Sequence, residues 1–200
     1  QLLKASKKKL FLFGFSKWKR KYVMSFLKDF EKKNIFFIND YSFFYKKVIT
    51  SSDFDSNSEI YIWGAKKYPL VEKIAHQKNI KITRVEDGFI RSISLGSDLT
   101  RPYSLIFDEI GIYYDPRKTS KLEKLINETE FDDKIIKDAN NLIDLIIKLS
   151  ISKYNSLTKD DYSIPKNINV ILVVGQVEDD ASVTYGANSM TNHTLLKTVR

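Results

Sequence analysis

The sequence predicts an α/β fold built on a mainly parallel sheet. Through the first 88 residues, short apolar segments of the kind that form buried strands alternate with amphipathic segments. This alternation is typical of parallel sheets covered by helices. Hydrophobic residues make up 42% of the 200 positions, which suffices for a folded core. No stretch approaches the roughly 20 apolar residues that cross a bilayer, so the chain itself is not expected to span a membrane.

Four strands and two helices are predicted in this first part. Aromatic residues recur every four positions from Trp18 to Phe30, which predicts an amphipathic helix over 16–33. A second helix is predicted over 68–79. The predicted strands are KLFLFGF at 9–15, NIFFI at 34–38, EIYIWG at 59–64 and KITRVEDG at 81–88.

Beyond Gly88 the pattern changes. The segment SLIFDEIGIYYDP at 104–116 contains two alternating runs and predicts a β-hairpin with Gly111 near its turn. Ser120 and Glu123 have the spacing of a capping box, which predicts the start of a short helix. Apolar residues at helical spacing predict a longer helix over 131–151.

The polar segment 152–167 gives the best domain boundary. We therefore expect one Rossmann-like unit over 1–165 and the start of a second over 166–200. Past the boundary, INVILVV at 168–174 predicts a strand buried on both faces, and 187–200 begins a helix.

Composition narrows the function classes. Cysteine is absent and only two histidines occur, so neither disulfides nor a metal site is expected. The formal net charge of +8 favours anionic partners. Neither glycine-rich phosphate fingerprint is present, which counts against Rossmann dinucleotide binding and P-loop nucleotide hydrolysis.

Two acidic turns follow predicted strands, where parallel α/β folds place their ligands. In RVEDGFIRS, Glu86 and Asp87 end a strand, and Arg91 and Ser92 follow closely enough to orient an anion. A salt-bridged turn is the purely structural interpretation of this segment.

The second turn, in VVGQVEDDASVTYG, places three consecutive carboxylates after the most apolar run. They are Glu178, Asp179 and Asp180. The structural interpretation is that Asp179 or Asp180 caps a following helix. The basic run SKWKRKYV at 16–23 is similarly open: it predicts either a helix with a basic solvent side or a face for membrane or nucleic acid.

Four motifs, in this order, resemble the capsule polysaccharide β-Kdo transferases. They are FGFSKWKR, the run from RVEDGFIRS to GIYYDP, SKYN, and VVGQVEDDASVTYG. The first and last are more similar to the C-terminal of the two transferase modules found in this family. The resemblance implies a GT-B-like fold, in which two Rossmann-like subdomains enclose the active site. It also implies that 1–165 is the acceptor-side subdomain and 166–200 the beginning of the donor-side one.

The resemblance further implies transfer of Kdo from CMP-β-Kdo to a Kdo-bearing phosphatidylglycerol acceptor, with retention of configuration and no cofactor. In the family pattern Q-x-x-x-D, Asp180 falls on the nucleophile and Gln176 on the paired position. Glu86 and Asp87 are then expected either to bind the acceptor or to supply the base that accepts the proton of its hydroxyl, and spacing does not say which of the two is the base. Arg91, Ser92, Glu178 and Asp179 are expected to contact or orient substrate.

The same resemblance implies a cytoplasmic protein, peripheral at the inner membrane and working with the capsule synthesis and export machinery, with no nucleic acid partner. It also implies further donor-binding residues after Arg200, so this chain alone is expected to be inactive. Two alternatives stay open. One is a non-catalytic basic module binding anionic membrane or nucleic acid, and the other is a degenerate module that serves as a scaffold.

Overall fold

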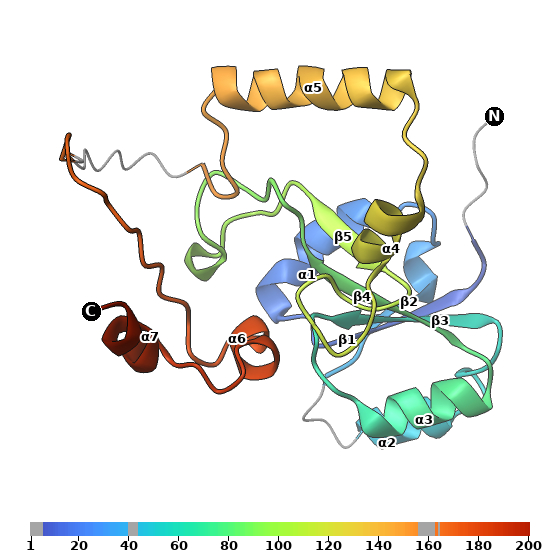
Figure 1. The fold of residues 1–200 in the computed structure, drawn as a ribbon. Coiled ribbons are helices and arrows are strands. Elements are labelled where there is room, and N and C mark those ends of the chain that lie inside the picture. The colour runs from blue at the N-terminus through green and yellow to red at the C-terminus, as the bar shows by residue number, and fades with distance from the viewer. Residues whose placement is uncertain (1–5, 40–43, 156–162, 164) are drawn as a thin grey trace.

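A five-stranded sheet forms the centre of the molecule (Figure 1). The computed structural model describes residues 6–39, 44–155, 163 and 165–200. The strand order is β2-β1-β3-β4-β5, in which the first four strands are parallel and β5 runs antiparallel to β4. The predicted α/β class is therefore confirmed. The strands are β1 (Lys9–Phe13), β2 (Ile35–Phe37), β3 (Ser58–Trp63), β4 (Lys81–Asp87) and β5 (Leu105–Asp108).

Helices cover both faces of this sheet. Helix α1 (Lys17–Val23) connects β1 to β2 on one face, and α2 (Phe44–Thr50) and α3 (Pro69–Gln77) lie together on the other (Figure 1). Alternation along the strands divides the core accordingly. Phe11 and Phe13 pack with the α2 and α3 side, whereas Leu10 and Leu12 pack with Val23 of α1. Because the order reverses direction at β1, a crevice is expected beyond the carboxyl ends of β1 and β3.

The helix predicted over 16–33 is shorter than expected. Helix α1 ends at Val23, and one 3₁₀ turn, Met24–Phe26, follows it. The backbone near Phe30 is engaged elsewhere, because the Ser6 N–H donates to the Asp29 carbonyl and the Glu31 N–H donates to the Ser6 carbonyl. Phe26 and Phe30 are partly buried although they lie beyond the end of the helix, so the four-residue aromatic spacing reflects burial and not helix length.

The predicted hairpin over 104–116 is wrong in its second half. Only β5 forms, and it pairs with β4 in the register Arg84 to Asp108 and Asp87 to Leu105. The Asp108 carboxylate accepts hydrogen bonds from the N–H groups of Ile110 and Gly111, which turns the chain away from the sheet. A second strand would need those amides for pairing.

Two helices follow β5. Ser120 and Glu123 form the predicted capping box at the start of α4 (Lys121–Glu128). Helix α5 (Asp133–Lys148) lies within the predicted 131–151 and runs apart from the sheet in Figure 1. Its apolar side chains are largely exposed, with Ile147 at 70%.

The buried strand predicted at 168–174 is absent. These residues form no regular element, and Leu172 is 84% exposed. A strand needs a hydrogen-bonding neighbour, and no strand in the described part of the chain pairs with this segment. Two helices follow, α6 (Ala181–Gly186) and α7 (Asn192–Val199), the second within the predicted 187–200. The proposed division at 165/166 stays a prediction.

Within the described residues, no helix combines the length and apolar character needed to cross a membrane.

Candidate active site

Three acidic side chains from two distant parts of the sequence line one cavity of about 360 Å³. Glu86 and Asp87 come from the end of β4, and Asp180 comes from the turn before α6. The remaining wall residues are Tyr113, Tyr114, Lys153, Tyr154, Ala181 and Ser182. The structure therefore brings together the three carboxylates that the sequence singled out for catalysis. Their chemical roles remain predictions.

Asp87 is the counter-charge of a buried arginine. The Arg91 side chain is fully buried, and its Nε lies 2.7 Å from Asp87 Oδ2. Arg91 also donates to Ser92 Oγ at 2.7 Å and to the Thr100 carbonyl at 3.2 Å. A buried guanidinium is tolerated only with such partners. Arg91 and Ser92, expected to contact substrate, are both buried inside the protein here, and neither lines the cavity.

Lys19 of α1 joins this cluster. Its Nζ lies 3.8 Å from Asp87 Oδ2 and 3.6 Å from the ring centroid of Trp63. Only 14% of the side chain is exposed, and this burial lowers the pKa of Lys19. Both interpretations of the run 16–23, a basic solvent side or a face for membrane or nucleic acid, placed its lysines on the surface. Lys19 departs from both because its position on α1 points to the ends of β3 and β4.

Glu86 has a different environment from its neighbour. Its Oε1 accepts from the Asp87 N–H at 2.9 Å, and its Oε2 accepts from the Tyr114 hydroxyl at 3.0 Å. That hydroxyl in turn accepts from the Ala65 N–H at 3.1 Å. Burial, as the largest cause, raises the pKa of Glu86. Burial and the adjacent Glu86 charge also raise the pKa of Tyr114.

The turn after β3 makes room for this hydroxyl. Gly64 has a φ of +62°, a conformation that side chains disfavour. A Cβ there would lie 2.9 Å from the Tyr114 hydroxyl and 3.2 Å from Glu86 Oε2. Tyr113 and Tyr114 were not predicted to be site residues, because they fell within the predicted hairpin.

Asp180 combines the two interpretations that the sequence left open. It caps α6, since its Oδ1 accepts from the Ser182 N–H at 2.8 Å and from the Ser182 hydroxyl at 2.6 Å. These hydrogen bonds lower the pKa of Asp180. The same side chain lines the cavity with Glu86 and Asp87. Capping engages Oδ1, and no hydrogen bond from the described residues reaches Oδ2.

The other acidic-turn residues lie outside this cavity. Glu178 Oε1 accepts from the Asn192 N–H at 2.8 Å, which places it at the start of α7. Gln176 exchanges two hydrogen bonds with the Asn192 side chain through its backbone, leaving its own amide exposed. Asp179 is exposed as well. The contacts of Gln176 and Glu178 with Asn192 hold the turn against α7.

The SKYN segment supplies a cation to the cavity. The Lys153 carbonyl accepts from the N–H groups of Arg91 at 2.8 Å and Ser92 at 3.2 Å. Asn155 Nδ2 donates to the Ser92 carbonyl at 3.0 Å. These bonds dock 152–155 on the segment after β4 and place Lys153 and Tyr154 on the cavity wall. The sequence identified the motif but not its contact with Arg91 and Ser92.

Comparison with known proteins places the chain in a family. Residues 58–161 match the family described as capsule polysaccharide biosynthesis protein. The chain belongs to this family. It is 41% identical over 145 residues to the capsule polysaccharide modification protein LipA of Neisseria meningitidis serogroup B, covering 72% of this chain and 20% of LipA. It is 32% identical over 195 residues to the lipopolysaccharide-processing protein LpsZ of Rhizobium meliloti, covering 94% and 43%.

Two solved structures share the fold of this member of the capsule polysaccharide biosynthesis family. Both are of KpsC from Thermosulfurimonas dismutans. The β-Kdo 2,7 transferase superposes with a TM-score of 0.67 at 29% identity, covering 96% of this chain and 57% of that one. The β-Kdo 2,4 transferase gives 0.60 at 25%, covering 88% and 51%. The predicted family and GT-B-like class are thereby confirmed, and the chain spans less than half the length of the curated relatives described above.

Proposed function

We propose that this chain is part of a retaining glycosyltransferase that transfers Kdo from CMP-β-Kdo to a Kdo-bearing phosphatidylglycerol acceptor. The observation that carries the proposal is the meeting of Asp180 with Glu86 and Asp87 on one cavity. Support also comes from the two structural neighbours, which are described as β-Kdo transferases. The assignment to the C-terminal of the two transferase modules is supported only by the sequence resemblance.

Asp180 is suited to be the nucleophile. The hydrogen bonds from Ser182 to Oδ1 lower its pKa, so the carboxylate is ionised at neutral pH. An Asp180 oxygen attacks the anomeric carbon, the bond from that carbon to the CMP phosphate breaks, and CMP leaves with the electron pair. The acceptor hydroxyl then attacks the same carbon and displaces the Asp180 carboxylate. Two inversions give overall retention.

Glu86 is the better candidate for the base. Asp87 is committed to Arg91, so its protonation would leave a buried guanidinium without a counter-charge. Glu86 is paired with no cation at ion-pair distance within the described residues, and its raised pKa makes it a stronger proton acceptor. It takes the acceptor's hydroxyl proton as the new glycosidic bond forms.

The anionic substrates require cationic surroundings. Both the Kdo carboxylate and the CMP phosphate have to approach a cavity with three carboxylates. Lys153 lines that cavity and Lys19 lies against Asp87, so local positive charge offsets part of the repulsion. The burial of Lys19 also takes one cation out of the basic face of α1. This disfavours the alternative of a basic module for membrane or nucleic acid.

The proposal extends to location and partners. A lipid-linked acceptor requires the enzyme to work at the surface of the inner membrane, on the cytoplasmic side where CMP-activated sugars are made. There it would hand its product to the capsule synthesis and export machinery.

The test is substitution of Asp180 in the complete protein. Asp180→Ala should abolish Kdo transfer while costing about 1 kcal/mol of stability through the lost helix cap. Asp132→Ala is the matched control, because Asp132 caps α5 in the same way, with Oδ1 2.8 Å from the Ile135 nitrogen, but lies outside the cavity. Mass spectrometry of wild-type protein with CMP-Kdo should find a Kdo-sized adduct on Asp180. An unchanged rate for Asp180→Ala would remove the assignment.

A further inference from the structure

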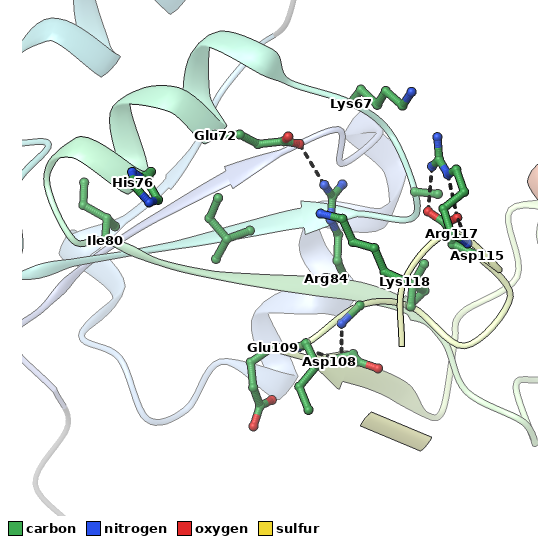
Figure 2. Close-up of a pocket in the computed structure, with 15 residues that line it drawn as sticks. Lys67, Glu72, His76, Ile80, Arg84, Asp108, Glu109, Asp115, Arg117 and Lys118 are labelled. Atoms are coloured by element: carbon green, nitrogen blue, oxygen red, sulfur yellow. Dashed lines mark hydrogen bonds and ion pairs between the residues drawn. The ribbon is translucent and has the colours of Figure 1, made fainter. Parts of the chain in front are cut away.

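A chain of hydrogen bonds through three residues separates the Asp180 cavity from a larger one. The larger cavity has a volume of about 560 Å³, and residues of α3, β4 and the chain after β5 line it (Figure 2). Ala65 belongs to its wall, whereas Tyr114 and Glu86 line the smaller cavity. The Ala65 N–H donates to the Tyr114 hydroxyl at 3.1 Å, and this hydroxyl donates to Glu86 Oε2 at 3.0 Å. Tyr114 therefore lies between the two cavities.

These two hydrogen bonds fix the direction of the Tyr114 proton. A backbone N–H can only donate, so the hydroxyl oxygen accepts from Ala65 and directs its own single proton to Glu86. Burial and the adjacent Glu86 charge raise the pKa of Tyr114, so the hydroxyl keeps this proton at neutral pH. Tyr114 is thus a neutral donor whose orientation toward the carboxylate is set.

The turn after β3 holds this donor in place. The Gly64 N–H donates to the Val85 carbonyl at 2.8 Å, which fixes the turn beside Glu86. A Cβ at Gly64 would lie 2.9 Å from the Tyr114 hydroxyl, so glycine leaves the hydroxyl its space. The Tyr114 ring packs edge-on against the Tyr113 ring, with 5.2 Å between their centroids. The hydroxyl is therefore positioned both by the backbone and by its own ring.

The Glu86 carboxylate is held at both of its oxygens. Oε1 accepts from the Asp87 N–H at 2.9 Å, and Oε2 accepts from Tyr114. Burial raises the pKa of Glu86, whereas these two hydrogen bonds favour the charged form and oppose that rise. Each carboxylate oxygen has a second lone pair, and Glu86 lines the cavity, so it can still accept a proton there.

We propose that Tyr114 is the positioning residue of the base, because its hydroxyl holds the Glu86 carboxylate charged and oriented for the acceptor hydroxyl. This inference rests on the proposed transferase function. As the new glycosidic bond forms, the acceptor's proton passes to Glu86, and Tyr114 keeps its own proton throughout. Tyr114 therefore acts on the reaction only through Glu86.

The test is Tyr114→Phe in the complete protein, which removes the hydroxyl and keeps the ring. The plateau value of kcat should fall about tenfold, as expected from losing a hydrogen bond to a charged group, with the acceptor KM unchanged. The fall of activity at low pH should move to higher pH, because the pKa of Glu86 rises further once Tyr114 no longer opposes the effect of burial. A merely structural role would lower stability without moving the pH profile.

Tyr113→Phe is the matched control. Tyr113 lines the same cavity, and its hydroxyl makes no hydrogen bond with any residue that the structure describes, so this variant should keep the wild-type pH profile. The other titratable groups that face Glu86 are the same in wild type and Tyr114→Phe, so a difference between the two reports on the lost hydroxyl. These groups are Lys19 of α1, Asp87 of β4, Tyr113, Lys153 and Tyr154 of 152–155, and Asp180 before α6.

A direct titration separates this inference from the proposed function, because it needs no turnover. Carboxyl signals of ¹³C-labelled glutamate are followed against pH by NMR, and the signal missing from Glu86→Gln identifies Glu86. The titration should move to higher pH in Tyr114→Phe and stay in place in Tyr113→Phe. An unchanged titration in Tyr114→Phe would overturn the inference, as would an unchanged pH profile of transfer. Absence of transfer by the wild-type protein, with the titration shifted as expected, would count against the transferase alone.

Discussion

At the scale of single residues, Glu86 and Asp87 are adjacent in sequence but differ in their surroundings. Successive side chains of a strand point to opposite faces, so Glu86 meets Tyr114 on the α3 side and Asp87 meets Arg91 and Lys19 on the other. One carboxylate faces a neutral donor and the other a buried cation. The difference gives each a separate task in the proposed reaction.

Glu86→Gln should lower the transfer rate about 100-fold or more, the range typical of losing a general base. The pH profile should change as well. Burial raises the pKa of Glu86, so wild-type activity falls as the pH drops through a value above the ordinary carboxyl range, where the base becomes protonated. The pKa of Asp180 is lowered, so it stays ionised through that window. Rate measurements across pH should show this fall in activity at low pH in the wild-type protein and not in Glu86→Gln.

Stability gives an independent check on the same pair. A folded-state pKa that is raised makes the Glu86 charge destabilising above the unfolded-state pKa, so Glu86→Gln should be as stable as wild type, or more so, at neutral pH. Asp87→Asn should instead cost about 3 kcal/mol, because it leaves Arg91 buried without a counter-charge. If thermal unfolding ranked the two variants in the opposite order, the division of roles would be refuted.

At the scale of elements, the segment 152–155 shows how a loop becomes part of the site. Its backbone carbonyl at Lys153 and the Asn155 amide bind the chain after β4. Asn155 has a φ of +48°, a conformation in which asparagine is common among residues other than glycine. The backbone conformation of Asn155 and the hydrogen bond of its side chain therefore both help to dock the segment 152–155 on the chain after β4.

Two substitutions separate these contributions. Asn155→Gly keeps the conformation but removes the bond to the Ser92 carbonyl, and Asn155→Ala removes both. Asn155→Ala should therefore be less stable than Asn155→Gly by about 1 kcal/mol. Both should raise the KM for CMP-Kdo, since Lys153 is no longer fixed at the cavity. Wild-type kinetics in both variants would show that the docking of this segment is not needed for transfer.

The elements also show what sequence can predict. The central strands β1 and β3 were predicted because their apolar runs and flanking turns are local signals, as was the capping box of Ser120. Lys19, Tyr114 and Lys153 became site residues only through tertiary contacts with Trp63, Glu86 and the chain after β4. The sequence gives each of them the same local pattern as an ordinary surface or strand residue. The acidic turns were identifiable because adjacent carboxylates, two in one turn and three in the other, repel one another and follow predicted strands.

At the scale of the whole molecule, exposed apolar side chains occur on α5, over 89–103 and along 168–174. The last of these segments was predicted to be a buried strand. Five of the seven residues in that segment are β-branched, which favours a strand, yet the segment has no strand to pair with in the described part of the chain. The KpsC structures that share this fold extend well beyond the matched portion, which covers 57% and 51% of their lengths.

Comparing residues 1–200 with the complete protein tests whether pairing is what the segment lacks. We expect the backbone amides of 168–174 to exchange hydrogen rapidly in residues 1–200 alone and to be protected in the complete protein, because a sheet of a second Rossmann-like subdomain would supply hydrogen-bond partners. Amides of β1 should be protected in both and serve as the internal control, since β1 is paired on both sides here. Transfer activity should accompany protection, because Asp180 lies six residues after this segment and a paired strand would fix the position of its turn. Rapid exchange at 168–174 in an active complete protein would show that the segment is not a strand, and that the apolar run has some other use.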